Sequence, residues 1–160
     1  VLAAQLPDSG YVSQRIGQSY SVLCASPDYI ARRGAPSTPQ ALRDHECLRL
    51  INPSYITDHW EFHGDEDVQR INLGPSAFQV NMGDAMIEAI EAGMGVGSLP
   101  VFSAQKGIDS GSLVRLLPQY RLQCLNVYAV YTNRRYLDAK IKVLISQLRS
   151  VLPGGQALAP

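Results

Sequence analysis

Two histidines four residues apart, His59 and His63, raise the question of a metal site. On a helix this spacing would bring both rings to one ion, but Trp60 and Phe62 alternate with polar residues, which favours a strand. In a strand, four residues span about 13 Å, and no nearby cysteine completes a ligand set. We therefore expect no metal site and no cofactor.

A nucleophilic enzyme would need an activated serine or cysteine. Ser98, in GVGSLP, lacks the second glycine of a nucleophile elbow and lies inside an expected strand. Cys24 and Cys47 could pair with His45, but Cys47 begins an apolar run that offers nothing to stabilise a thiolate. We expect no enzymatic activity from these residues.

Three neighbouring acidic residues, Asp65, Glu66 and Asp67, could in principle act as an acid and a base. They fall between the two arms of an expected hairpin, where solvated charges are common in the turn. This run therefore indicates a turn and not a catalytic pair.

The stretch EAGMGVGSLPVF places Gly93, Gly95 and Gly97 at alternate positions. A dinucleotide-binding loop carries its glycines after a strand and before a helix, so that helix N-terminal amides meet the phosphates. Here apolar residues three or four apart predict a helix that ends at Gly93, and VGSLPVF predicts the strand that follows. The glycines thus indicate the end of a helix and not a phosphate site.

The composition indicates a globular protein without a strong affinity for nucleic acid. Hydrophobic residues make up 46% of the 160 residues, and 14 Lys plus Arg balance 14 Asp plus Glu. No apolar run approaches the roughly 18 residues that span a bilayer, and the start does not resemble a signal peptide. The opening VLAA has no initiator Met, so we expect the end of a strand in a longer chain.

The three cysteines, Cys24, Cys47 and Cys124, are odd in number, widely spaced and in apolar settings. This favours small buried side chains in a reducing compartment over disulfides.

Helix start signals place two short helices in the first third of the chain. Ser26 is an expected N-cap, with Pro27 at the first helical position and Gly34 as the stop. Thr38 and Pro39 form a second pair of N-cap residue and first helical proline. Buried strands are expected over 19–25 and 47–51, which gives a β-α-α-β order.

The remaining elements follow from periodicity. Trp60 and Phe62 with Val68 and Ile71 predict a hairpin, and SAFQVN predicts a strand. Asn81 and Asp84 form a cap-like pair at the start of the next helix. We expect strands over 113–117 and 125–131, and a disordered tail over 153–160. A last helix carries an apolar stripe and an Asp138–Lys142 pair, the stripe being Leu137, Ile141, Leu144, Ile145, Leu148 and Leu152.

The ordered set of motifs resembles the effector-binding domain of LysR-type transcriptional regulators. It runs through LPDSGYVSQRIGQSYSVLCASPDYIARRG, a W-x-F pair, NMGDAMIEAIEAGMGVGSLPVF, GSLVRLLPQY and VYAVYTNRRYLDAKIKVLISQL. The match extends from about Leu6 to Leu152 and is similar to the subgroup with L-P-D-S and S-P-x-Y motifs. Many relatives carry an Arg and a Gly where this chain has Leu2 and Ala4, so the resemblance supplies no arginine contact to an acidic effector there.

The resemblance implies an α/β fold of the type 2 periplasmic-binding-protein class, with two Rossmann-like lobes joined by crossover strands. Residues 1–19 would end an incomplete first lobe and form a crossover, and 20–123 would form the second lobe. Residues 124–152 would return to the first lobe as a strand and closing helix. A winged helix-turn-helix and the start of the first lobe would precede Val1.

The resemblance also implies a small-molecule effector, a carboxylate or an aromatic compound, bound in a cleft between the lobes. Ligands of open α/β sheets lie at the carboxyl ends of strands and at helix N-termini. Candidate ligand-binding residues therefore follow the expected strands and start the expected helix: Ile51, Asn52, Pro53, Asn81, Met82, Gly83, Asp84, Leu99 and Pro100. Each could instead serve only as a cap or turn.

The implied protein is a cytoplasmic homodimer or tetramer that binds DNA only through the missing N-terminal domain and does not bind a membrane. Two alternatives remain. One is a periplasmic solute-binding protein of an importer, which shares the fold, and the other is an interaction module without a ligand.

Overall fold

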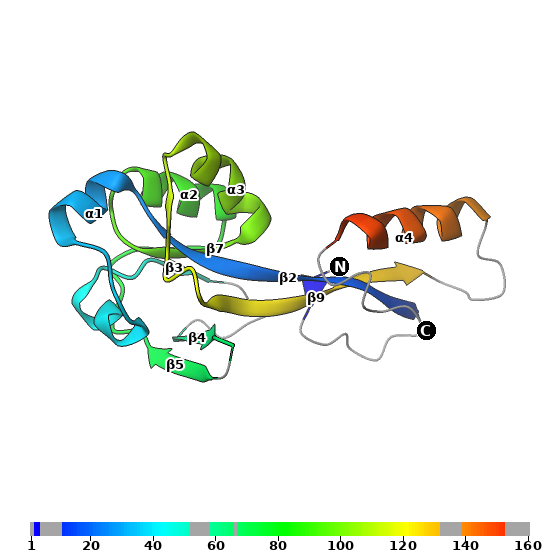
Figure 1. Cartoon of the computed structure of the whole chain (residues 1–160), viewed down its shortest axis with the longest axis horizontal. Helices are drawn as coiled ribbons and strands as arrows, with labels where there is room; N and C mark the ends of the chain where they lie inside the picture. Colours follow the sequence, from blue (N-terminus) through cyan, green and yellow to red (C-terminus); the bar gives the residue numbers. More distant parts are fainter. Residues whose placement is uncertain (1, 4–10, 52–57, 66, 132–138, 153–160) are drawn as a thin grey trace. The chain divides into compact units, whose positions relative to one another are not determined.

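The structure is a computed structural model that describes residues 2–3, 11–51, 58–65, 67–131 and 139–152. The chain divides into two compact units (Figure 1). Unit 1 comprises Val1–Ser19 and Cys124–Pro160, and unit 2 comprises Tyr20–Gln123. The long strands β2 (Val12–Ala25) and β9 (Arg121–Tyr131) contribute residues to both.

Unit 2 is built around β2, which pairs with β7 (Gly97–Pro100) and with β8 (Val114–Leu116), both antiparallel. The sheet follows the order β5-β4-β9-β2-β7. Strands β4 (His59–His63) and β5 (Val68–Asn72) form the expected hairpin, in which Trp60 lies opposite Ile71. The hairpin prediction and its acidic turn are therefore confirmed, with Glu66 outside the described residues.

The alternation of side chains along β2 divides the core between the two faces of the sheet. Val22 and Cys24 belong to a buried cluster with residues of α2 (Gly83–Glu91) and α3 (Val101–Ser110). Leu23 and Ala25 point the other way and join a cluster that contains Trp60, Phe62 and Tyr29. Successive residues of a strand face opposite sides, so one strand supports both clusters.

The two short helices occur where their start signals predict them. Helix α1 spans Pro27–Arg33, and the Ser26 hydroxyl accepts a hydrogen bond from the Tyr29 amide at 3.3 Å. Gly34 follows it with a φ of 76°. The second element is the 3-10 helix η1, Pro39–Asp44, in which Thr38 makes no side-chain cap.

A parallel arrangement lies beside the antiparallel strands. Strand β3 (Arg49–Leu50) pairs in parallel with β6 (Gln79–Val80), and Cys47 forms a parallel bridge with Val96, just before β7. The strand expected over 47–51 is therefore shorter than predicted, although its backbone pairs on both sides. The Leu48 amide donates to the Val96 carbonyl at 2.8 Å, and the Ile51 amide to that of Val80 at 2.7 Å.

Two predictions about helix starts are wrong. Helix α2 begins at Gly83 with Met82 as its N-cap and without a side-chain cap, so Asn81 lies before the helix and does not cap it. Met82 has an extended conformation, and its carbonyl accepts the first helical hydrogen bond from the Met86 amide at 3.2 Å. The capping position therefore falls one residue later than the Asn81–Asp84 spacing predicts.

The strand expected to run through Val101 and Phe102 ends instead at Pro100, where α3 begins. Inside α3, Ala104 and Gly107 are buried, and a Cβ at Gly107 would lie 2.6 Å from the Leu113 side chain. The helix ends at Gly111, whose φ is 78°. The glycine that packs the helix closely against Leu113 also weakened its helical sequence signal.

Unit 1 contains β1 (Leu2–Ala3), which is antiparallel to β9, and α4 (Ala139–Val151). The predicted last helix is confirmed, but its stripe is mostly exposed: Ile145 is buried, whereas Ile141, Leu144 and Leu148 are exposed. Leu137, Asp138 and the expected tail 153–160 lie outside the described residues. Among the described helices, none is long and apolar enough to cross a membrane.

Candidate functional site

The carboxyl ends of three parallel segments meet at one edge of unit 2. Strand β3 is parallel to β6, and its approach at Cys47 is parallel to the segment that enters β7. Parallel strands end at the same edge of a sheet, so Ile51, Asn81 and Pro100 lie along one border. We call this border, from Ile51 through Asn81–Asp84 to Pro100, the carboxyl edge.

Two helices begin at the carboxyl edge without a side-chain cap. Helix α2 starts after Met82, and α3 starts after Pro100. The first N–H groups of a helix have no acceptor within the helix, so such ends attract hydrogen-bond acceptors and negative charge. A Cβ placed on Gly83 would meet nothing within 4 Å, so the first turn of α2 borders open space.

The carboxyl edge also exposes large apolar side chains. The exposed fraction is 42% for Ile51, 61% for Met82 and 63% for Phe102, the second residue of α3. Leu99, by contrast, is fully buried in the cluster with Met86, so only its backbone is available at the edge. The edge therefore combines amide donors with apolar contact surface.

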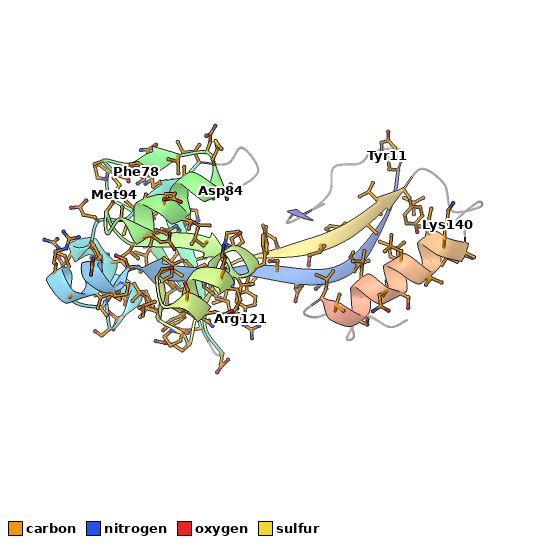
Figure 2. The ribbon with its side chains drawn as sticks, turned by 90° about the horizontal axis from the view of Figure 1, so that it is seen from above. Tyr11, Phe78, Asp84, Met94, Arg121 and Lys140 are labelled. Atoms are coloured by element: carbon orange, nitrogen blue, oxygen red, sulfur yellow. The ribbon has the colours of Figure 1, made fainter. Side chains whose placement is uncertain are left out.

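Seven of the nine predicted site residues lie within the described part of the chain. Asn52 and Pro53 lie outside the described residues, whereas the other predicted residues fall on the carboxyl edge or directly beneath it. Figure 2 shows Asp84 on the side of unit 2 from which β2 and β9 continue, with Phe78 and Met94 farther from that side. Helix α2 therefore runs away from the edge, with its N-terminus at the edge.

Sequence reasoning missed a pair of residues next to this edge. The guanidinium carbon of Arg121, the first residue of β9, lies 4.9 Å from the centre of the Tyr20 ring. Tyr20 precedes Ser21, which pairs with Pro100 at the end of β7. No local motif links residues a hundred positions apart, and only the pairing of the strands brings them together.

The two histidines of β4 contact acidic and basic side chains. His59 and His63 lie in strand β4, as the alternation predicted. The Nδ1 atom of His59 is 2.6 Å from an Asp58 oxygen and 3.1 Å from Nη2 of Arg70. The hydrogen bond from His59 is the main cause that lowers the pKa of Asp58 below its ordinary value. The described part of the chain contains no cluster of three His, Cys, Asp or Glu side chains suited to an ion.

The glycine-rich stretch terminates α2 and makes room for the backbone. Gly93 has a φ of 73°, and its amide donates to the Ile90 carbonyl at 2.9 Å. A Cβ on Gly95 would collide with the Glu46 carbonyl oxygen. The prediction of a helix end followed by a strand is confirmed, and these amides do not lie at a helix N-terminus.

The cysteines differ in exposure. Burial raises the pKa of the Cys24 thiol to about 12 and that of Cys47 to about 11. Cys124 is exposed, so the prediction of three buried cysteines is wrong for this residue. Burial and the nearby Arg33 guanidinium lower the pKa of His45, whose Nδ1 lies 3.1 Å from the Tyr29 hydroxyl. Among the described residues, the His45 ring therefore has a tyrosine hydroxyl and not a thiol as its hydrogen-bond partner.

Two of the hollows that lie away from the carboxyl edge adjoin Glu46. One, of about 270 Å³, is lined by Tyr29, Arg32, Gly93 and Met94 among others. The other, of about 240 Å³, lies between η1 and the residues that follow β5. Both adjoin Glu46, which precedes β3, so they lie at the amino end of the parallel segments.

The sequence matches the family described as the LysR substrate binding domain over residues 1–153. The chain belongs to this family. It has the type 2 periplasmic-binding-protein-like α/β fold of LysR regulatory domains.

Among curated relatives, the chain is 33% identical over 136 residues to a Haemophilus influenzae protein described as an uncharacterized HTH-type transcriptional regulator. This match covers 85% of the chain and 46% of that protein. The chain is also 30% identical over 139 residues to the Escherichia coli regulator DmlR, covering 86% of the chain and 44% of DmlR. The chain thus spans about half the length of these relatives.

Solved structures of LysR regulators are similar to the chain. The CrgA regulatory domain from Neisseria meningitidis superposes with a TM-score of 0.74 at 26% identity, covering 94% of this chain and 74% of that one. The regulatory domain of AphB from Vibrio vulnificus, treated with cumene hydroperoxide, gives a TM-score of 0.75 at 24% identity, with 94% and 73% coverage. These relatives are regulators, which disfavours the importer alternative.

Proposed function

We propose that this chain is the effector-sensing part of a bacterial LysR-type transcription factor and that the effector binds at the carboxyl edge of unit 2. The observation that carries the proposal is the meeting of two uncapped helix starts with exposed Ile51, Met82 and Phe102 at one edge. Such an edge offers directional donors and apolar surface together, which small organic ligands require.

The proposed mechanism is a shift between two conformations. Residues 20–123 form one lobe, and residues 1–19 with 124–152 belong to the other. An effector that binds one arrangement of the lobes more tightly increases its population, and only this difference in affinity can change DNA binding. DNA is bound by a winged helix-turn-helix outside this chain, in a cytoplasmic homodimer or tetramer.

A thermal-shift screen of the protein at its full length tests the proposal. The panel contains aliphatic and aromatic carboxylates, sugars, amino acids and neutral aromatic compounds. A ligand present at a hundred times its dissociation constant adds about 2.7 kcal/mol, so we expect one chemical class to raise the melting temperature by several degrees.

A pair of glycine variants then places the site. Gly83→Ala and Gly74→Ala each add a methyl group where nothing lies within 4 Å, but only Gly83 is on the carboxyl edge. We expect Gly83→Ala to weaken binding at least several-fold while Gly74→Ala leaves it unchanged. Equal effects would place the ligand elsewhere. A melting temperature that no compound changes would reject the sensing function and favour a ligand-free interaction module.

A further inference from the structure

Arg121 and Tyr20 form a cation–π pair on unit 2, at the level of the carboxyl edge. The guanidinium carbon lies 4.9 Å from the ring centre, within the range of a cation–π contact. Tyr20 is partly buried against the cluster that contains Leu99, whereas Arg121 is exposed. Ser21, the next residue after Tyr20, pairs with Pro100, so the pair lies beside the end of β7.

The charge of Arg121 is not neutralised within the described part of the chain. His63 lies opposite Arg121 in the pairing of β4 with β9. The carboxylate of Glu61, two residues before His63, lies 3.6 Å from His59 Nε2 and 3.9 Å from His63 Nε2. The described salt bridges all involve these histidines, and none involves Arg121.

A cation–π contact leaves N–H donors of an arginine available for a ligand. The guanidinium lies over the face of the ring, and it carries five N–H donors, more than one ring contact uses. A tyrosine ring that holds the guanidinium in place reduces the side-chain entropy lost when a ligand binds. A planar carboxylate is the partner that such a fork binds through two parallel hydrogen bonds.

The other charge along the edge restricts where an anion can bind. Asp84 lies in the first turn of α2, where its carboxylate opposes a ligand anion despite the free amides. Figure 2 shows Asp84 and Arg121 both on the side of unit 2 from which β2 and β9 continue. The end of the edge beside Arg121 therefore favours an anion, and the end beside Asp84 disfavours one.

We propose that Arg121, held by the ring of Tyr20, binds the carboxylate of the effector, while the apolar side chains of the edge contact the uncharged part. The effector is then a small organic acid. This inference rests on the proposed function, because it names the ligand class of the same edge.

The test uses the full-length protein and pairs of ligands that differ in charge and hardly in shape: benzoate with benzamide, and succinate with succinamide. Binding is measured by calorimetry and by thermal shift. We expect at least one acid to bind and its amide to bind at least tenfold more weakly. Arg121→Gln should lower the affinity for the acid at least tenfold and leave the affinity for the amide unchanged. Arg121→Lys should cause an intermediate loss of affinity for the acid.

Two further variants distinguish a direct contact of Arg121 with the carboxylate from an effect of the protein's net charge. Arg43→Gln removes the same charge from an exposed residue of η1, remote from the carboxyl edge, and should leave binding unchanged. Tyr20→Leu keeps an apolar side chain against the cluster but removes the ring face, and should weaken the acid several-fold. If Arg121→Gln and Arg43→Gln lowered the affinity for the acid equally, the cause would be the net charge of the protein, and the inference would be overturned.

The outcomes distinguish the two proposals. If neutral compounds bind as well as acids and Gly83→Ala weakens them while Arg121→Gln does not, the edge is a sensor site and the Arg121 anchor is wrong. If none of these compounds nor any member of the wider screen binds, both proposals are rejected.

Discussion

The side chain of Arg32 connects α1 to the end of α2: its Nη2 atom donates to the carbonyl oxygen of Gly93 at 2.7 Å. Gly93 itself has a φ of 73°, a conformation that L side chains rarely adopt. A Cβ at this position would also lie 2.9 Å from Nη2 of Arg32. The absence of a side chain at Gly93 thus permits both the left-handed backbone conformation and the close approach of Arg32.

Gly93→Ala should therefore destabilise the protein. The left-handed conformation alone costs a residue with a Cβ about 1–2 kcal/mol, and displacement of Arg32 adds to this loss. We expect a fall of several degrees in melting temperature, measured by calorimetry. Gly74→Ala is the control, because a Cβ there meets nothing and no positive φ is involved. Equal stability of the two variants would contradict this account.

The two short helices allow a direct comparison of caps. The hydroxyl of Ser26 accepts from the Tyr29 amide, whereas Thr38 makes no side-chain cap to η1. Ser26→Ala should lower the free energy of unfolding by about 0.5–2 kcal/mol, and Thr38→Ala should change it by less. Denaturant titration of both variants measures the difference. A larger loss in Thr38→Ala would show that cap geometry does not set the stability of these helices.

Local signals predicted most elements of unit 2, because their causes are local. The Ser26-Pro27 start, the alternation of Trp60 and Phe62, and the stop at Gly93 each act within a few residues. The sequence analysis did not predict helix α3, because apolar Val101 and Phe102 continue the pattern of the preceding strand and Gly107 interrupts the helical pattern. Its helical state depends on packing against Leu113, which a local pattern does not contain.

The candidate site was predictable only in part. The rule that ligands lie at the carboxyl ends of strands located Ile51, Met82 and Pro100, and their role as ligand contacts stays a prediction. Sequence could not show that the Leu99 side chain is buried or that Met82 caps α2. It also could not bring Tyr20 next to Arg121, because that contact depends on how β9 is placed in the sheet.

Cysteine reactivity should follow burial. The pKa of Cys24 is raised to about 12 and that of Cys47 to about 11, so both stay protonated at pH 8. Iodoacetamide reacts with the thiolate and should modify exposed Cys124 first, with the other two modified only after unfolding. Mass spectrometry of peptides from native and denatured protein measures the order. Cys24 modified as fast as Cys124 in the native protein would contradict the burial.

The raised pKa of Cys47 makes the free energy of unfolding depend on pH. In the unfolded chain a thiol loses its proton near its ordinary pKa of 9.0, whereas folded Cys47 retains it to about 11. The contribution is therefore fully present below pH 9 and is lost as the pH rises from 9 towards 11. Denaturant unfolding between pH 8 and pH 11 should show a steeper loss of stability in the wild type than in Cys47→Ala. Parallel curves would mean that this thiol titrates alike in both states.

Asn81 distinguishes a structural role from a ligand contact. Because Met82 occupies the N-cap and Asn81 is exposed before the helix, Asn81→Ala should change the free energy of unfolding by less than about 0.5 kcal/mol. If the effector binds at the carboxyl edge, the same variant should weaken binding, because the lost amide lies beside the first turn of α2. Denaturant titration and calorimetric binding on one protein preparation give both quantities. A loss of about 1 kcal/mol or more in stability with unchanged affinity would restore the capping role and remove Asn81 from the site.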